Sequence, residues 1–499
     1  MRKEFIRLLT SRDSWCISRQ RAWGVPIPLF FNKTTDLPLI NPELVNSTIE
    51  TLRKYSTDAW WTLPVEKFIS EEMANKFSFD LSDVEKGRDI LDVWFDSGCS
   101  CLAVDPGEKI NQANLYIEGV DQFRGWFLSS LLISTIMRNQ SPYKQLLWHG
   151  FVVDETGKKM SKSVGNVVDP IDCIYGSQKH NIPAVGLDGL RLWAARSQNE
   201  SLVKLGTGTL TECRQLLLRI RNSFSFMLGN IENAPEKIKF KSLVDRYILH
   251  RLSILDDEVR ISYEQHNFRK AVHLIDRFFT ADLSQFYFTV SKDRLYCEPV
   301  DSPLRKSALF TMKTLTNHLL HLLAPLIPFT SEEVSKIVNG AHYQPKGILA
   351  SKFFTFSKKI SKNENQPANS IVSFFMELRS KWLHHAAPTD STDFIIDLMM
   401  PDTEISMIVN ETGLTVEQLE DLAQDVLHVI KVNFHNVVKH GEHSESFQLP
   451  FHGIDNFFEV DVVILWNLVP PETKCPRCRR FQVEEKQELC KRCSNAVPK

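Results

Sequence analysis

A short polar stretch, Val153–Asn166, carries residue types suited to holding phosphate. It reads VDETGKKMSKSVGN and follows an apolar, strand-like run that ends at Val153. Lysine is a compact cation on a flexible stem that can follow phosphate oxygens, serine hydroxyls donate hydrogen bonds, and Gly157 permits a tight turn. The composition allows a phosphate-binding loop, although loops with these residues are more often ordinary solvated connectors.

The C-terminal tail holds a second candidate site. Its cysteines form two knuckles, Cys475-x-x-Cys478 and Cys490-x-x-Cys493, which can close a tetrahedral site of four sulfur ligands. We predict a structural Zn²⁺ there, because so small a piece has no core of its own and needs the metal to fold. Basic side chains around the cysteines predict contact with a nucleic-acid backbone, with solubility alone as the alternative. They are Lys474, Arg477, Arg479, Arg480, Lys486, Lys491 and Arg492.

The apolar pattern predicts the elements that position these sites. A strand at Leu115–Ile117, a turn at Glu118–Gln122, a helix over Phe123–Asn139 and a strand at Leu146–Val153 make a β–α–β unit and imply a parallel sheet. From about 205 to 340 the periodicity is helical, which predicts a bundle. The polar stretch 357–370 indicates a linker, and 371–470 a smaller α/β unit.

The sequence therefore predicts a multidomain α/β plus α fold with four parts. The predicted parts are 1–204, 205–345, 346–470 and the tail 471–499. The formal net charge of −2 argues against a protein that binds nucleic acid through its overall charge, so such contacts must come from local patches. No apolar run has membrane-spanning length, and four of the ten cysteines in one tail cluster indicate a reducing compartment.

Several stretches resemble one family. Residues 159–163, KMSKS, are identical to a signature of class I aminoacyl-tRNA synthetases, and they follow a predicted strand as that signature does. The segments 10–30 (TSRDSWCISRQRAWGVPIPLF), 91–98 (LDVWFDSG) and 116–127 (YIEGVDQFRGWF) resemble the isoleucyl branch, and 286–298 (FYFTVSKDRLYCE) resembles its mitochondrial versions. By this resemblance the chain is identified as a member of the bacterial and mitochondrial isoleucyl-tRNA synthetases.

The resemblance implies the second half of a Rossmann-type catalytic domain and gives roles to its residues. Lys159 and Lys162 would steady the triphosphate of ATP, with Mg²⁺ sharing the charge, in a loop that also includes Met160, Ser161 and Ser163. Glu118 would hold the aminoacyl-adenylate, helped by Asp121 and Gln122, and Trp94 and Trp126 would flank the isoleucine side chain. From the residues alone, helix capping and core packing are the alternatives for these five.

The resemblance also implies partners. The bundle would bind the anticodon stem-loop of tRNA(Ile), and the zinc module would contact the tRNA. Three positions differ from many relatives: Val120 and Phe123 stand where many have serine and histidine, and Arg479 stands where many have tryptophan. The bundle's candidate contacts, none of them favoured over a solvated role, are Arg214, Arg219, Arg221, Arg251 and Arg277.

Two expected parts of such an enzyme are not found in the sequence. The first half of the ATP site carries an H-x-G-H signature, and His440-Gly441-Glu442-His443 lies in the wrong context for it. The inserted editing domain is also not found. We therefore expect the C-terminal half of an isoleucine–tRNA ligase, inactive alone in forming isoleucyl-AMP and charging tRNA(Ile). The alternatives are a stand-alone tRNA-binding module, or one half of a split enzyme with a separate N-terminal half. The expected compartment is the mitochondrial matrix, with the cytoplasm as alternative.

Overall fold

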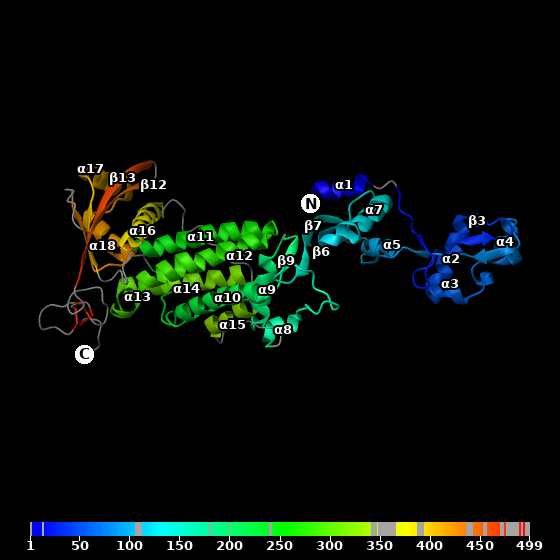
Figure 1. The fold of residues 1–499 in the computed structure, drawn as a ribbon, viewed down its shortest axis with the longest axis horizontal. Coiled ribbons are helices and arrows are strands. Elements are labelled where there is room, and N and C mark those ends of the chain that lie inside the picture. Colours follow the sequence, from blue (N-terminus) through cyan, green and yellow to red (C-terminus); the bar gives the residue numbers. More distant parts are fainter. Residues whose placement is uncertain are drawn as a thin grey trace. The chain divides into compact units, whose positions relative to one another are not determined.

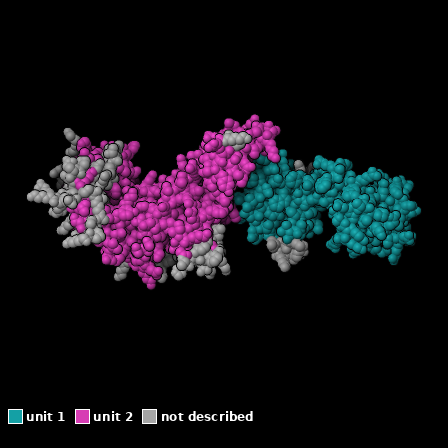
Figure 2. Space-filling view, turned by 90° about the horizontal axis from the view of Figure 1, so that it is seen from below, with its two compact units in different colours: residues 1–151, 199–203 teal, residues 152–198, 204–499 magenta. Residues whose placement is uncertain are grey.

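A computed structural model gives the fold, and its elements are labelled in Figure 1. The chain forms two compact units: the first holds residues 1–151 and 199–203, and the second holds 152–198 and 204–499 (Figure 2). Among the described residues, no helix is long and apolar enough to cross a membrane. The structure describes residues 2–11, 14–104, 112–178, 181–198, 200–238, 242–340, 347, 366–386, 394–435, 443–452, 457–469, 474–475, 489–490 and 493–494.

The predicted β–α–β unit is confirmed in the first unit. Strands β6 (Ala113–Gly119) and β7 (Tyr143–His149) pair in parallel, and helix α7 (Trp126–Arg138) connects them. The helix begins later than predicted because Val120–Phe123 form a 3₁₀ turn, η3. It ends where Asn139 adopts a left-handed conformation, with φ of 52°.

The predicted strand Leu146–Val153 is wrong in one respect, because it is interrupted at Gly150. Strand β7 ends at His149 and the short strand β8 (Phe151–Val153) begins after the glycine. A side chain at Gly150 would collide with the backbone of Glu200 and Ser201, so only glycine fits this close approach.

The rest of the first unit forms small sheets and short helices. A three-stranded sheet of order β3–β2–β4 packs on helix α2, with Phe30, Trp60 and Phe68 as its buried aromatic core. Strand β1 pairs antiparallel with β5. The bounds are α1 (Arg2–Thr10), β1 (Ser18–Arg19), β2 (Phe30–Asn32), β3 (Pro38–Leu39), α2 (Pro42–Tyr55), α3 (Ala59–Thr62), η1 (Val65–Lys67), α4 (Glu71–Lys76), η2 (Leu81–Asp83), β4 (Val84–Lys86), β5 (Ile90–Leu91), α5 (Val93–Gly98) and α6 (Ser100–Val104).

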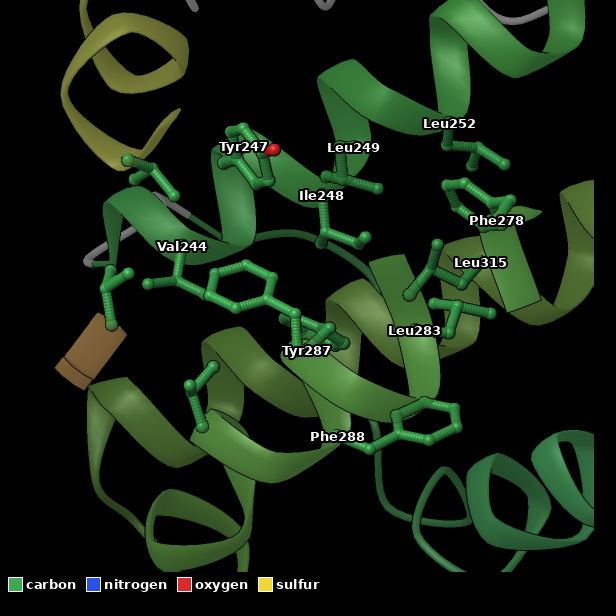
Figure 3. Close-up of a cluster of buried hydrophobic side chains, with 14 of the residues drawn as sticks. Val244, Tyr247, Ile248, Leu249, Leu252, Phe278, Leu283, Tyr287, Phe288 and Leu315 are labelled. Carbon is green, nitrogen blue, oxygen red and sulfur yellow. The ribbon is translucent and has the colours of Figure 1, made fainter. Parts of the chain in front are cut away.

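The predicted helical bundle is confirmed in the second unit. In Figure 3, Ile248 and Leu252 of α11 lie among Leu283, Tyr287 and Leu315 from other helices of the same buried core. Helices α12 and α13 are joined by a π-helical segment, η4. The bounds are α8 (Pro170–Tyr175), α9 (Gly186–Arg196), β9 (Leu202–Lys204), α10 (Thr207–Leu228), α11 (Leu243–Glu264), α12 (Phe268–Arg277), η4 (Phe278–Tyr287), α13 (Phe288–Tyr296), α14 (Pro303–Leu323) and α15 (Pro328–Asn339).

One buried carboxylate ties four of these helical segments together. Asp245 of α11 is fully buried and accepts hydrogen bonds from Tyr287 Oη at 2.8 Å, Arg294 Nη1 at 3.0 Å and Ser307 Oγ at 2.6 Å. A buried charge is stable only when it is paired and hydrogen-bonded. Tyr287 and Arg294 belong to the FYFTVSKDRLYCE segment, so part of that segment holds the bundle together.

The C-terminal part of the second unit is an α/β structure, as predicted. Its sheet has the order β11–β10–β13–β12, with β10 and β11 parallel and the other neighbours antiparallel. Its core is continuous with that of the bundle. The bounds are α16 (Gln366–Ala386), β10 (Phe394–Met399), α17 (Asp402–Thr412), α18 (Val416–Leu427), β11 (Lys431–His435), β12 (Ser444–His452) and β13 (Phe457–Leu468).

The predicted linker 357–370 is wrong over its last residues. Helix α16 already begins at Gln366. Its apolar residues Ile371, Phe375 and Trp382 are fully or almost fully buried, and their helical spacing continues the helix backwards into the polar residues before them.

Candidate functional site

The KMSKS loop (residues 154–166) is organised around one carboxylate. Asp154 Oδ1 accepts hydrogen bonds from the backbone and side chain of Thr156 at 3.0 and 2.6 Å and from Lys158 N at 2.9 Å. Its Oδ2 accepts from Asn166 Nδ2 at 2.8 Å. The hydrogen bonds from Thr156 and Asn166 lower the pKa of Asp154 to about 2. The carboxylate is therefore ionised at neutral pH and closes the loop.

Asn166 fixes the other end of the loop. Its Oδ1 accepts the backbone N–H of Ser161 at 3.0 Å, and the Ser161 and Ser163 hydroxyls lie 3.2 Å apart. Gly165, with φ of 74°, donates its N–H to Ser161 O at 3.1 Å and completes a tight turn. Sequence analysis missed Asp154 and Asn166, although an Asp two residues before a Thr is a known signal for such a turn.

The side chains of the motif point in different directions. Met160 packs against a small apolar core that includes Cys173, Ile182 and Val185, whereas Lys159 and Lys162 are exposed. A partly buried methionine between two exposed lysines anchors the loop while both cations face solvent. This arrangement can present positive charge to an anion such as a phosphate.

Glu155 joins the loop to helix α10. Its Oε1 accepts the backbone N–H of Gly208 at 2.7 Å, in the first turn of the helix. A Cβ atom at Gly206 would collide with Glu155 Cγ, so a larger residue there would have to displace the Glu155 side chain. A carboxylate at a helix N-terminus satisfies an otherwise unpaired N–H and suits the helix dipole. The local sequence around Glu155 does not mark this contact, because Gly208 lies 53 residues away.

In the first unit, the turn at Glu118–Gln122 lies at the carboxyl end of strand β6. Glu118 and Asp121 are exposed, and Glu118 Oε2 accepts only a long bond, 3.3 Å, from Gly119 N among the contacts described. Gln122 differs: its Oε1 accepts the N–H of Trp126 at 3.0 Å, and its Nε2 donates to Asp121 at 3.1 Å. The capping alternative thus describes the contacts of Gln122, while the two carboxylates face solvent where open α/β sheets bind ligands.

Trp126 is held rigidly at the start of α7. Its ring stacks on Tyr116, with centroids 4.1 Å apart and planes 6° apart, and its Nε1 donates to Ser100 Oγ at 2.9 Å. Phe123 is buried against Phe5 and Phe127. An apolar residue therefore completes the core at this position instead of reaching a ligand.

Trp94 is 38% exposed and lines a cavity of about 660 Å³ in the first unit. Its ring lies against the backbone of Gly125, because a Cβ atom at Gly125 would be only 2.5 Å from Trp94 Cη2. Trp94 and Trp126 therefore both lie at the start of helix α7. The cavity is mostly apolar, with Trp15, Phe95, Leu128 and Ile133 beside the polar groups Arg19, Asp92 and Arg124.

Asp92 positions this cavity wall. It is 6% exposed and accepts hydrogen bonds from Arg19 Nη2 at 2.6 Å, Trp15 Nε1 at 3.0 Å and Trp94 N at 3.3 Å. The last bond caps helix α5, which carries Trp94. Asp92 therefore joins two segments that lie far apart in the sequence, and sequence analysis did not single it out.

Three of the four tail cysteines converge. Cys475, Cys490 and Cys493 are buried, and their Sγ atoms all lie within 4.8 Å of one another. Cys490 N donates to Cys475 Sγ at 3.4 Å. Tetrahedral Zn–S bonds of about 2.3 Å place sulfurs roughly 3.8 Å apart, so three buried thiols at this spacing fit Zn²⁺. Cys478 and the basic tail residues other than Lys474 lie outside the described residues.

Three of the predicted arginines of the bundle are tied to neighbouring helices. Arg219 pairs with Asp276 at 2.7 Å, Arg221 with Glu333 at 2.8 Å, and Arg251 with Asp282 at 3.0 Å. The remaining two, Arg214 on α10 and Arg277 on α12, are exposed. The ion pairs give the first three a structural role that sequence analysis could not distinguish from a role in binding.

Comparisons with known proteins agree with these local structures. Residues 1–205 match the family "tRNA synthetases class I (I, L, M and V)", and residues 245–387 match the "Anticodon-binding domain of tRNA ligase". A mitochondrial isoleucine–tRNA ligase of Macaca fascicularis is 33% identical over 521 residues, which covers 99% of this chain and 50% of the relative.

Bacterial relatives give the same picture. An isoleucine–tRNA ligase of Nautilia profundicola is 36% identical over 502 residues, covering 98% of this chain and 50% of the relative. The chain thus spans about half the length of the curated relatives it matches. Among solved structures, a ternary LeuRS–tRNA–LeuAMS complex of Agrobacterium radiobacter K84 has a TM-score of 0.49 at 19% identity, covering 72% of this chain and 46% of that one.

Proposed function

Because this chain belongs to the class I tRNA synthetases and its relatives are isoleucine–tRNA ligases, we propose that it supplies one part of an isoleucine-activating and tRNA-charging enzyme. The reaction would form isoleucyl-AMP from isoleucine and ATP, and then transfer isoleucine to tRNA(Ile). In this proposal, residues other than those of this chain form the N-terminal half of the enzyme and supply the other wall of the ATP site.

The KMSKS loop would act in the first step. As the substrate carboxylate attacks the α-phosphorus, negative charge grows on the leaving pyrophosphate, and Lys159 and Lys162 would neutralise it from the loop surface. Mg²⁺ bound with ATP would share that charge. Ser161 and Ser163 would add hydroxyl donors, while Met160, Asp154 and Asn166 hold the loop in shape.

The first unit would bind the amino acid and its adenylate. Glu118 and Asp121 are exposed carboxylates at the end of β6 and would accept hydrogen bonds from the ligand's amino or hydroxyl groups, with Gln122 holding Asp121 in place. Trp94 and Trp126 would bound the isoleucine side chain. The apolar cavity lined by Trp94 supports the assignment of that residue, because a branched aliphatic side chain is bound mainly by burial.

Three further assignments complete the proposal. The bundle would bind the anticodon stem-loop, which the family match of residues 245–387 supports. Cys475, Cys490 and Cys493, with Cys478 on sequence grounds, would hold a structural Zn²⁺. The mitochondrial matrix would be the compartment, supported by mitochondrial proteins among the relatives, with the cytoplasm as the alternative.

The single observation that carries this function is the closed KMSKS loop with two exposed lysines. The test is isoleucine-dependent ATP–pyrophosphate exchange, measured for the chain alone and after addition of the N-terminal half of a bacterial relative. We expect exchange only in the mixture, and a loss of roughly a hundred-fold for Lys159→Ala and Lys162→Ala. Lys158→Ala, on the same loop, is the matched control.

Two results would contradict the proposal. Robust exchange by the chain alone would show that no second half is needed. Equal losses for Lys158→Ala and the other two variants would mean that general loop charge, and not two placed cations, supports the reaction.

A stand-alone tRNA-binding module is the second candidate. The observation in its favour is that the core of the second unit runs without interruption from α9 through the bundle into the C-terminal sheet. It predicts tight tRNA binding by the chain alone. Replacing Arg214 or Arg277 by alanine should weaken binding and lower the slope of its salt dependence by about 1 each, whereas Arg221→Ala should not.

A further inference from the structure

A fourth buried cysteine accompanies the three that converge in the tail. Cys297 follows helix α13 of the bundle and is 4% exposed. It belongs to one buried cluster with Cys475, Cys490 and Cys493, and the partly buried Leu489 packs against that cluster. The N–H of Cys297 donates to Asp293 O at 2.7 Å, so the end of the helix fixes its position.

Cys297 is not placed like a metal ligand. Its Sγ is not among the three sulfurs that lie within 4.8 Å of one another. A tetrahedral zinc site needs four ligands, and the two tail knuckles already offer four by their spacing. Cys297 thus shares one buried cluster with the ligand cysteines but comes from the end of a bundle helix.

We propose that the thiol of Cys297, which belongs to the helical bundle, covers the ligand sulfurs of the metal centre without binding the metal itself. Zn²⁺ binding then holds the knuckle against the end of α13. A zinc–thiolate group carries net negative charge, which a weak S–H donor stabilises. Metal binding in the tail is therefore coupled to packing at the end of the bundle.

The alternative is that Cys297 only fills space, as buried cysteines often do. Cys213 of α10 provides the comparison, because it is equally buried, at 2% exposure, but lies in the large aliphatic and aromatic core. Cys297 instead has three cysteines as its buried cluster partners. The composition of the cluster distinguishes the two residues.

The inference rests on the zinc site of the proposed function, and metal affinity tests it. Zn²⁺ affinity and stoichiometry are measured on the full chain by competition with a chromogenic chelator. We expect wild type, Cys297→Ala and Cys213→Ala each to bind one Zn²⁺, with affinity lowered roughly 10- to 100-fold in Cys297→Ala only. Cys297→Ser should fall between, and Cys490→Ala should abolish binding. Circular dichroism checks that each variant is folded.

Alkylation followed by mass spectrometry gives a second readout. Removing Zn²⁺ from the wild type should expose Cys297 to alkylation while Cys213 stays protected. Unchanged affinity in Cys297→Ala would overturn the inference and leave the zinc site standing. Loss of all binding in folded Cys297→Ala would overturn it too, by making Cys297 a ligand. Failure of the wild type to bind Zn²⁺ would refute the zinc site itself.

Discussion

Asn166 Nδ2 donates a 2.8 Å hydrogen bond to Asp154 Oδ2, and this bond closes the KMSKS loop from its last residue to its first. The same asparagine accepts the N–H of Ser161 through its Oδ1. One amide thereby connects the strand end to the motif itself. The conformation of the loop consequently depends on two residues outside the five-letter signature.

Replacing Asp154 by alanine should open this loop. Four hydrogen bonds end on its carboxylate, from Thr156 N, Thr156 Oγ1, Lys158 N and Asn166 Nδ2. We expect amide hydrogen exchange over residues 156–166 to accelerate roughly ten-fold. Lys158→Ala removes an exposed charge from the same loop and should leave the exchange rates unchanged. Equal protection in both variants would contradict the role given to Asp154.

The same carboxylate predicts a dependence on pH. Its hydrogen bonds to Thr156 and Asn166 lower the pKa of Asp154 from 3.8 to about 2. A group with a lowered pKa contributes its full stabilisation above the unfolded value, and that contribution is lost as pH falls from 3.8 to about 2. Loop protection should thus be constant from pH 7 to 5, which exchange measurements corrected for the intrinsic rate can check.

Gly125→Ala should displace the ring of Trp94. A Cβ atom would lie 2.5 Å from Cη2 and 2.7 Å from Cζ3 of that ring. Overpacking of this kind costs about 1 to 3 kcal/mol, and the ring can relieve it by moving into the neighbouring cavity. The emission of Trp94 alone is obtained by comparing the fluorescence of each protein with that of the same protein carrying Trp94→Phe. This difference reports the environment of the Trp94 ring. Gly229→Ala, where the nearest atom would be 3.4 Å away, is the control and should leave that difference unchanged.

His318 should make the second unit sensitive to mild acid. Burial, together with the positive charge of Arg260 and the influence of His321, lowers the pKa of His318 to about 4. The imidazole is therefore neutral at pH 7, although Asp256 Oδ1 lies 3.9 Å from its Nε2. The contribution of neutral His318 to the free energy of unfolding is complete above the unfolded pKa of 6.5. It is lost as pH falls toward 4, and the total loss is about 3 kcal/mol.

Denaturant unfolding at a series of pH values between 7.5 and 4.5 measures this effect. The His318→Gln variant should lose the part of the pH dependence that wild type shows in that window. His273→Gln, at an exposed position on α12, should retain it. A wild-type stability that is flat over this range would contradict the prediction.

Asp245→Ala should strongly destabilise the bundle. It removes the partner of Arg294, which is 3% exposed, and leaves a buried positive charge without its carboxylate. Breaking one side of a buried pair costs about 3 to 5 kcal/mol in the free energy of unfolding. The double variant Asp245→Ala/Arg294→Met should recover part of the loss. Asp301→Ala breaks an exposed pair with Lys306 and should cost well under 1 kcal/mol.

Local pattern predicted much of this fold, and distant contacts explain what it missed. The β–α–β unit and the bundle follow from apolar periodicity, which depends only on neighbouring residues. Asp92 is held by Trp15 and Arg19, 77 and 73 residues away, so no local pattern marks it. The break at Gly150 likewise depends on the backbone of Ser201 approaching it.

The candidate site residues likewise fall into those that a local motif marks and those that only distant contacts reveal. The signature residues Lys159 and Lys162 were found because the motif is contiguous. Cys297 was not connected to the tail, because nothing in its own segment differs from an ordinary helix end. The sequence could not separate structural from binding roles among the bundle arginines, because their ion-pair partners lie on other helices and depend on the tertiary fold.

The bond from Gly208 N to Glu155 has a mechanical consequence. Helix α10 has 22 residues, so it is a stiff rod about 33 Å long that starts at the KMSKS loop and runs into the bundle. A displacement of Glu155 would therefore act directly on the first turn of this helix. The far end of α10 packs among the helices matched to anticodon binding, so one continuous helix joins the loop to that domain.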